Sequence, residues 1–127
     1  MLVDDSELAL ASLTRWMRKY LPLQVLGQAA DGQQGYDLAC ALRPDLVITD
    51  LNMPRLDGFR LAEMLRQEYP EMKLIITSSD ESPTVIAASR RRGADAFIPK
   101  FRLPEELAGA IRRLFPRLAE IGATCAP

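Results

Sequence analysis

Short apolar runs alternate with longer amphipathic stretches along the chain, and this alternation is the clearest signal in the sequence. Five runs rich in Val, Ile, Leu and Ala predict strands, at residues 1–3, 24–30, 46–50, 73–77 and 94–99. The stretches that follow them repeat apolar residues at helical spacing and predict helices, at residues 6–20, 33–43, 59–69, 83–93 and 104–115. This order predicts an α/β fold, a doubly wound five-stranded parallel sheet with five helices covering both faces.

Capping residues support several of these helix boundaries. Ser6 can accept a hydrogen bond from the first turn of the first helix, and Pro22 ends that segment. Ser82 and Pro83 are typical of an N-cap and a first helical position, and Gly93 is typical of a helix C-terminus.

The central run, Leu46–Asp50, is apolar and β-branched until it ends in a carboxylate. Such a run is typical of a strand buried on both faces of a parallel sheet. Ligands of these sheets bind at the carboxyl ends of the strands, which is where Asp50 is expected. The alternative is that Asp50 only caps the following segment or turns the chain.

Polar residues also end the other predicted strands. Asp4 and Asp5 end the first strand, Ser78 follows the fourth, and Lys100 follows the fifth. Because the carboxyl ends of parallel strands meet at one edge, we expect these side chains to converge on Asp50.

The chemistry of this group is coherent. Three carboxylates repel one another and need a cation, and oxygen ligands without histidine favour a hard ion, Mg²⁺ or Mn²⁺. Lys100 adds an ammonium group and Ser78 a hydroxyl, so the group could hold a phosphoryl moiety around a nucleophilic Asp50.

Composition excludes several other functions. The 127 residues include no histidine, which excludes a Ser-His-Asp hydrolase and a phosphohistidine carrier. The two cysteines form no disulfide framework; Cys40 lies in an apolar helical pattern and is expected to be buried, and Cys125 lies in the tail.

The absence of a disulfide framework fits a cytoplasmic location, and the charge and hydropathy patterns bear on possible partners. The net charge of -1 gives no bulk attraction to nucleic acid or membrane, and no apolar run is long enough to span a bilayer. Asp4 and Asp5, close to the N-terminus, exclude a signal peptide. The basic cluster Arg90–Arg92 is interpreted as the solvated end of a helix. We therefore expect no direct nucleic-acid or membrane partner.

Together these residues resemble the receiver domain of two-component response regulators, over essentially residues 1–115. The matching segments are Leu2–Ser6, Ala30–Gly32, Asp45–Pro54, Asp57–Gly58, Ser78, Gly93–Lys100 and Pro104–Leu107. The resemblance implies a flavodoxin-like strand order of 2-1-3-4-5. We expect one receiver domain over residues 1–127, with a core over about 1–115 and a helix extension or flexible tail at 116–127.

The resemblance also implies roles for the site residues. Asp50 would be the phospho-acceptor, Lys100 would contact the phosphoryl oxygens, and Ser78 would swing toward the phosphoryl group. Asp5, Asp50 and the backbone carbonyl of Asn52 would bind Mg²⁺ directly, and Asp4 would act through a metal-bound water. The chain would catalyse no reaction beyond its own phosphorylation and dephosphorylation.

Three further residues have positions that the family uses for switching and timing. Phe97 would change rotamer after Ser78 moves and so alter the face made by the fourth helix, fifth strand and fifth helix; a plain core aromatic is the alternative. Asn52 and Asp80 match positions that tune the phosphoryl lifetime, with loop capping as the alternative. Thr77 competes with Ser78 for the hydroxyl role, and the spacing to Lys100 favours Ser78.

Two departures from the family pattern stand out. The first strand offers only Met1–Val3 before the acid pair, so it is short. Phe101 follows Lys100 where many receivers have a proline in a cis peptide bond, which predicts a trans bond here.

The implied partners are a sensor histidine kinase or phosphotransfer protein, and an output domain or target protein that binds the switching face. A phosphorylation-dependent homodimer is left open. The main alternative function is a degenerate receiver that acts only as a protein-interaction module. An aspartate-nucleophile phosphatase is disfavoured because Asn52 stands where its second acid would be, and a flavin or nucleotide binder because no glycine-rich loop follows the first strand.

Overall fold

A parallel sheet of five strands forms the centre of the molecule, in the order β2-β1-β3-β4-β5. The computed structural model describes residues 1–117. The strands are β1 (Leu2–Val3), β2 (Gln28–Ala29), β3 (Leu46–Asp50), β4 (Lys73–Ser78) and β5 (Ala96–Pro99). The predicted doubly wound α/β fold and its strand order are confirmed.

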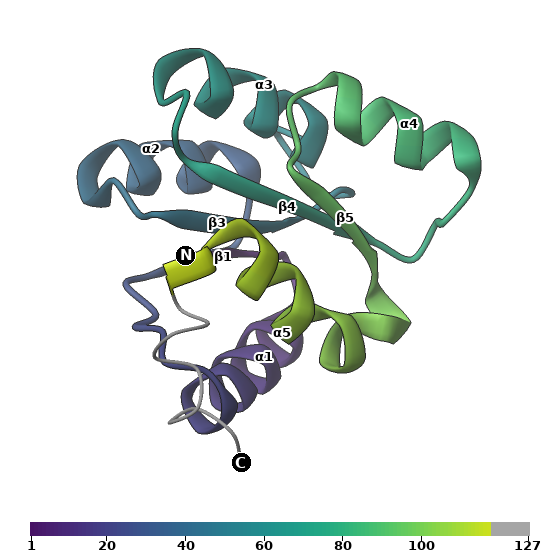
Figure 1. The fold of residues 1–127 in the computed structure, drawn as a ribbon. Helices are drawn as coiled ribbons and strands as arrows, with labels where there is room; N and C mark the ends of the chain where they lie inside the picture. Colours follow the sequence, from purple (N-terminus) through teal and green to yellow (C-terminus); the bar gives the residue numbers. More distant parts are fainter. Residues whose placement is uncertain (118–127) are drawn as a thin grey trace.

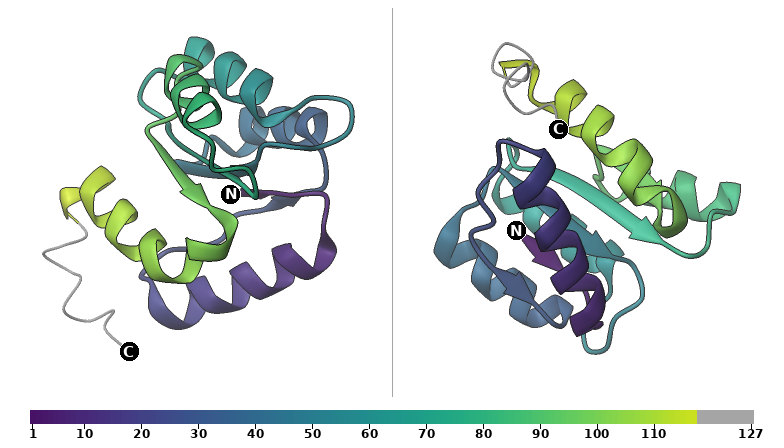
Figure 2. Two further views of the ribbon diagram at one scale, coloured as in Figure 1. Left: turned by 90° about the vertical axis from the view of Figure 1, so that its right-hand side faces the viewer. Right: turned by 90° about the horizontal axis from the view of Figure 1, so that it is seen from below.

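Helices cover both faces of this sheet. They are α1 (Glu7–Tyr20), α2 (Gly32–Leu42), α3 (Gly58–Glu68), α4 (Pro83–Arg91) and α5 (Leu103–Leu114), with a short 3₁₀ helix, η1 (Lys100–Arg102), before α5. Helices α1 and α5 lie side by side on one face, and α2, α3 and α4 lie on the other (Figures 1 and 2). This arrangement leaves the ends of the strands as the places where polar side chains can gather.

Two apolar clusters, one on each face of the sheet, make up the core. Successive strand residues point to opposite faces, so Val47 packs under α2 and α3 while Ile48 packs under α1 and α5. The same alternation places Ile76 in the first cluster and Ile75 in the second. All five residues of β3 are buried, as its uninterrupted apolar pattern predicts.

Side-chain caps fix the start of four helices. The Oγ atom of Ser6 accepts a hydrogen bond from the backbone N–H of Ala9, and Ser82 does the same for Val85, which confirms both predicted N-caps. Asp31 and Asp57 cap α2 and α3 in the same way. Gly93 has a φ of +105°, a left-handed conformation that suits glycine just after α4.

Strand β2 is much shorter than the predicted range 24–30. Strand β1 contributes two residues, which pair as Leu2 with Gln28 and Val3 with Ala29, and before Gln28 the carbonyl of Gly27 accepts one more hydrogen bond from β1, from the N–H of Leu2. The expected shortness of β1 thus shortens β2 as well. Strand β5 begins at Ala96 rather than residue 94.

Three smaller expectations concern single residues. Cys40 is half-buried rather than buried, because its side chain lies at the α2–α3 seam where its Sγ is 3.5 Å from Glu68 Oε2. No cis peptide bond occurs within residues 1–117, as predicted for the bond before Phe101. From residue 118 onward, the predicted helix extension or tail lies outside the described residues, and so does Cys125.

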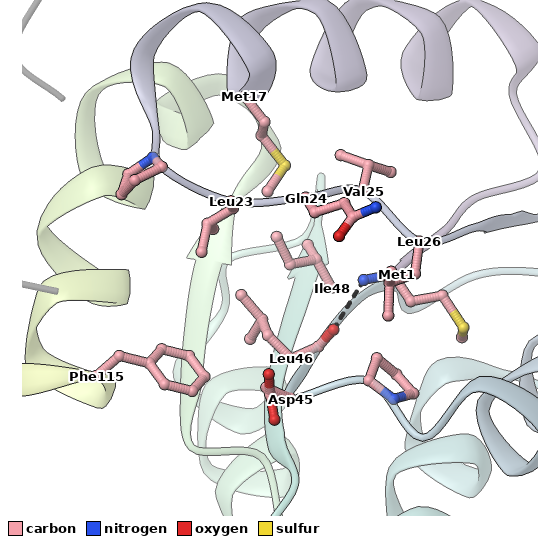
Figure 3. A pocket seen from close by; sticks show the side chains of 12 residues that line it. Met1, Met17, Leu23, Gln24, Val25, Leu26, Asp45, Leu46, Ile48 and Phe115 are labelled. Atoms are coloured by element: carbon pink, nitrogen blue, oxygen red, sulfur yellow. Dashed lines mark hydrogen bonds between the residues drawn. The ribbon is translucent and has the colours of Figure 1, made fainter. Parts of the chain in front are cut away.

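The amino-terminal ends of the strands hold a cavity of about 310 Å³ (Figure 3). The amino group of Met1 donates a hydrogen bond of 2.8 Å to the carbonyl of Leu46 beside this cavity. Burial lowers the pKa of that amino group to about 6, against the opposing effect of Asp45. The cavity lies at the opposite end of the sheet from the predicted acidic site. Within residues 1–117, no helix has both the length and the apolar character needed to cross a membrane.

Candidate functional site

The sheet register brings the predicted polar residues to one edge. The last pairs of the sheet are Val3 with Thr49, Asp50 with Thr77, and Ser78 with Pro99. Asp50 and Ser78 belong to these pairs, and Asp4 and Lys100 come directly after them, so all four residues lie at the carboxyl edge. The structure thereby confirms that Asp4, Asp50 and Lys100 converge, as strand topology alone predicts.

Three carboxylates form the centre of the site. One oxygen of each of Asp4, Asp5 and Asp50 lies within 4.8 Å of the other two, so these side chains could hold a metal ion. Asp50 is 5% exposed and Asp4 8%, whereas Asp5 is open to solvent. Burial raises the pKa of Asp50, and the charge of Asp4 raises it further, while Lys100 opposes the shift.

Lys100 joins two of these acids. Its Nζ lies 3.0 Å from Asp4 Oδ2 and 3.4 Å from Asp50 Oδ2. Although burial acts to lower the pKa of Lys100, the hydrogen bond to Asp4 and the charges of Asp50 and Asp4 raise it overall, so the ammonium form is favoured. One ammonium against three carboxylates leaves the group negative, which suits a divalent cation with oxygen ligands.

The backbone fixes how Asp4 is presented. Its Oδ1 accepts a hydrogen bond of 2.9 Å from the N–H of Ser6, and its Oδ2 accepts one from Lys100. Both carboxylate oxygens therefore have a protein partner already. Asp5, which is exposed at the same edge, is freer to offer oxygen atoms to an ion.

Gly58 fixes the loop that follows Asp50. A Cβ atom at Gly58 would overlap the carbonyl oxygen of Asp50, so only glycine permits this approach. The N–H of Gly58 donates to the carbonyl of Leu51, and the N–H of Leu51 donates to the carbonyl of Thr77. Asn52, within this loop, is exposed.

Ser78 ends β4 and is connected to the start of α4. Its side chain is fully buried, and its Oγ accepts a hydrogen bond of 3.1 Å from the N–H of Asp80. The Oδ1 of Asp80 in turn accepts a hydrogen bond from the N–H of Ser82, the N-cap of α4. A displacement of Ser78 would therefore disturb the entry to α4.

Thr77 and Phe97 lie on opposite faces of the sheet. Thr77 faces α1 and α5, away from the side of Ser78, and its hydroxyl has no hydrogen-bond partner among the described residues. Phe97, in β5, is half-buried and packs against the cluster that includes Leu74 and Ile76.

Two features of the site are not anticipated by the sequence reasoning. One is the N–H of Ser6 that orients Asp4, and the other is the contact of Gly58 with the backbone of Asp50. The dipeptide Asp57-Gly58 signals a tight helix start, but the approach to Asp50 depends on the tertiary fold.

The chain is similar in sequence to curated response regulators. The chain is 29% identical to the nitrate/nitrite response regulator protein NarL of Escherichia coli, over 89% of this chain and 52% of that protein. It is 31% identical to the response regulator GacA of Pseudomonas aeruginosa, over 91% of this chain and 54% of that protein. The chain therefore spans about half the length of these curated relatives.

A solved structure and the sequence pattern of a protein family also resemble this chain. The response regulator domain of Thermotoga maritima CheB superposes with a TM-score of 0.81 at 27% identity, covering 89% of this chain and 92% of that one. The sequence pattern of the response regulator receiver domain matches residues 1–112. With the strand order, the acidic edge and this match in agreement, the chain belongs to the response regulator receiver domain family of two-component systems.

Proposed function

We propose that this chain is a phospho-acceptor receiver in which Asp50 takes a phosphoryl group from the phosphohistidine of a partner kinase or phosphotransfer protein. The observation that carries the proposal is the position of Lys100, whose ammonium lies within 3.4 Å of Asp50 and 3.0 Å of Asp4 in a cluster of three acids. A structural ion pair would need one acid; this group has two acids beyond the pair.

Asp50 would act as the nucleophile. One carboxylate oxygen of Asp50 forms a bond to phosphorus while the bond from phosphorus to the donor's imidazole nitrogen breaks, and the imidazole leaves with that electron pair. Burial raises the pKa of Asp50, and nearby Lys100 counteracts this shift, which helps keep the carboxylate ionised at neutral pH. Lys100 then has a phosphoryl oxygen as an additional anionic partner.

The three acids fit a divalent ion. Asp5, Asp50 and the backbone carbonyl of Asn52 would hold Mg²⁺ or Mn²⁺, and Asp4, whose oxygens are engaged by Ser6 and Lys100, would act through a bound water. Such an ion supplies charge neutralisation for the phosphoryl oxygens.

Ser78 would transmit the change to the α4-β5-α5 face. Attraction of its hydroxyl to a phosphoryl oxygen competes with the hydrogen bond from Asp80, which is linked to the N-cap of α4. Phe97, half-buried in β5, would then repack, and the altered face would bind an output domain or target protein. Asn52 and Asp80 would set the lifetime of the phosphoryl group from their positions beside the site.

The similar response regulators suggest which proteins would receive the signal from this chain. Several of them are regulators about twice as long as this chain, so an output domain or a separate target would receive the signal. We place the chain in the cytoplasm, with a histidine kinase or phosphotransfer protein as donor and a phosphorylation-dependent homodimer as one form of output.

Phosphorylation with a small donor tests the proposal. The chain is incubated with acetyl phosphate and Mg²⁺, and the mass of the intact protein is measured. We expect one phosphoryl group per chain, with loss of the signal in Asp50→Asn or in EDTA, and an unchanged signal in Asp37→Asn, an exposed acid on α2. A chain that takes no phosphoryl group and shows no spectral change with beryllofluoride would instead be an interaction module, and labelling that persists in Asp50→Asn would overturn the assignment of the acceptor.

A further inference from the structure

Helix α4 is attached to the rest of the molecule in different ways at its two ends. It packs against β5, at the edge of the sheet, and lies on the same face as α3 (Figure 1). Within α4, all of which is described, Ser89 in the carboxyl-terminal half is the only fully buried residue. Because so little of this helix is buried, the contacts at its two ends decide how it can move.

Two arginines attach the carboxyl-terminal end of α4 to α3. Arg66, on α3, donates hydrogen bonds of 3.1 Å from Nε and 2.9 Å from Nη2 to the carbonyl of Gly93. Arg92 donates a hydrogen bond of 2.7 Å to Glu63 of α3, and its guanidinium lies 5.5 Å from the ring centre of Phe59. A Cβ at Gly93 would lie 3.0 Å from two carbons of Arg66, so these two residues also pack closely.

The amino-terminal end of α4 is connected in another way. The hydroxyl of Ser82 accepts a hydrogen bond from Val85, within the first turn of the helix. The N–H of Ser82 donates to Asp80, and the N–H of Asp80 donates to the hydroxyl of Ser78. Among the described residues, no hydrogen bond or ion pair joins residues 79–86 to another helix. The first turn of α4 therefore follows Ser78, whereas the last turn follows α3.

We propose that α4 tilts about its carboxyl-terminal end, with Arg66 and Arg92 as a clamp and Gly93 as the pivot. Gly93 suits this role because its φ of +105° lies in a region that glycine adopts without strain. The first turn of α4 would then display the position of Ser78, and a partner that distinguishes two states of the chain must contact that turn. That phosphorylation is the event that moves Ser78 rests on the proposed function; the pivot does not.

The tilt predicts how far each residue of α4 moves. A rigid helix that tilts about one end displaces each residue in proportion to its distance from that end. At about 1.5 Å per residue, Thr84 lies about 13.5 Å and Arg91 about 3 Å from Gly93 along the helix. Thr84 should therefore move roughly four times as far as Arg91.

Pairs of spin labels measure this ratio on the full chain, with Cys40→Ser and Cys125→Ser as the background. One label is attached at Thr84→Cys or Arg91→Cys, and the second at Arg15→Cys on α1 or Asp37→Cys on α2, all exposed positions. Two reference positions keep a movement visible whichever way it points. Distances from pulsed electron double resonance are compared before and after addition of Mg²⁺ and beryllofluoride, a phosphoryl mimic.

We expect the shift at Thr84→Cys to be at least three times the shift at Arg91→Cys. Equal shifts would mean that α4 moves as a whole, and a larger shift at Arg91→Cys would place the pivot at the other end; either result overturns the proposal. So does the absence of any shift when ¹⁹F NMR shows that beryllofluoride is bound.

Ser78→Ala tests the pivot without a phosphoryl mimic. It removes the acceptor of the Asp80 N–H, so the distance distribution should broaden at least twice as much at Thr84→Cys as at Arg91→Cys. If beryllofluoride does not bind, the proposed function fails and this comparison alone decides on the pivot. Equal broadening at the two labels, or none at either, overturns the pivot.

Removal of the clamp tests the roles of the two arginines. Arg66→Ala combined with Arg92→Ala should bring the ratio of the two shifts, or of the two broadenings, close to one. Arg90→Ala, which removes an exposed arginine at the same end of α4, should leave the ratio unchanged. If the double variant does not fold, Arg92→Ala alone should lower the ratio by a smaller amount. A ratio that stays at its parent value without these side chains overturns their assignment as the clamp.

Discussion

The ammonium nitrogen of Lys100 lies 3.4 Å from a carboxylate oxygen of Asp50, and this pair connects the end of β3 to the residue after β5. Lys100 therefore neutralises part of the charge that a metal ion would otherwise neutralise. A metal ion and Lys100 should compete electrostatically for the same acids, although they need not occupy the same position.

Replacement of Lys100 by Met should raise the affinity of the chain for Mg²⁺. Two like charges about 4 Å apart repel by about 1 kcal/mol even at the dielectric constant of water, so the gain should be roughly fivefold or more. Calorimetric titration with Mg²⁺ measures this change, and Lys19→Met, an exposed lysine near the end of α1, serves as the control with unchanged affinity. An unchanged or weaker affinity in Lys100→Met would show that the ammonium does not act on the metal site.

The pKa of Asp50 predicts how stability depends on pH in the absence of metal. Burial raises this pKa above its ordinary value of 3.8, so the folded chain holds the proton more tightly than the unfolded chain does. As pH rises from 3.8 through the folded pKa, the contribution of Asp50 to the free energy of unfolding therefore falls, and it stays low at higher pH.

Asp50→Asn removes this titration and provides the measurement. In urea unfolding with EDTA, the variant should be more stable than the parent at pH 7, and the difference should shrink as the pH approaches 4. Adding Mg²⁺ should stabilise the parent and not the variant, because binding to the folded state adds stability. A difference that stays constant between pH 4 and pH 7 would contradict the raised pKa.

The sequence predicts the parts of this molecule that local patterns determine. The run Leu46–Asp50 is a strand because its apolar residues need burial on both faces, and Ser6 and Ser82 cap helices through bonds that span three residues. The convergence of Asp4, Asp50 and Lys100 follows from topology, since each ends or follows a parallel strand.

Features that depend on contacts between distant segments are not predictable in this way. The length of β2 is set by how much of β1 is present to pair with it, which its own apolar residues do not reveal. Likewise, neither the approach of Gly58 to Asp50 nor the unpartnered hydroxyl of Thr77 has a local signature, because each depends on what tertiary packing places against the residue.

Arg66 should contribute strongly to stability because one side chain connects three backbone or acidic groups. From α3, it donates hydrogen bonds to the carbonyls of Gly93 and Pro70 and to the carboxylate of Asp95. Asp95 also accepts a hydrogen bond from the N–H of Leu74. The guanidinium therefore attaches α3 to the segment that leads into β5.

Arg66→Ala should lower the free energy of unfolding by about 1–2 kcal/mol, because it removes the donors to the part-buried carbonyl of Gly93 and to the more exposed acceptors of Pro70 and Asp95. Arg66→Lys should recover little, since an ammonium cannot reproduce the fork of donors. Arg60→Ala, an exposed arginine on the same helix, should change stability by less than about 0.5 kcal/mol. Equal effects of Arg66→Ala and Arg60→Ala in urea unfolding would contradict this assignment.

Gly58 and Gly109 provide a matched pair of glycine-to-alanine changes, one in contact with the backbone of Asp50 and one in open space on α5. A Cβ at Gly58 would overlap the carbonyl of Asp50, so Gly58→Ala should displace the loop after β3 and destabilise the fold by about 1–3 kcal/mol. Gly109 lies within α5 with no atom near its missing Cβ, so Gly109→Ala should stabilise the fold by about 0.5–1 kcal/mol. Urea unfolding measures both changes, and calorimetric titration of the folded variants should show weaker Mg²⁺ binding in Gly58→Ala alone. If Gly58→Ala is as stable as the parent and binds Mg²⁺ equally well, the position of Asp50 does not depend on this contact.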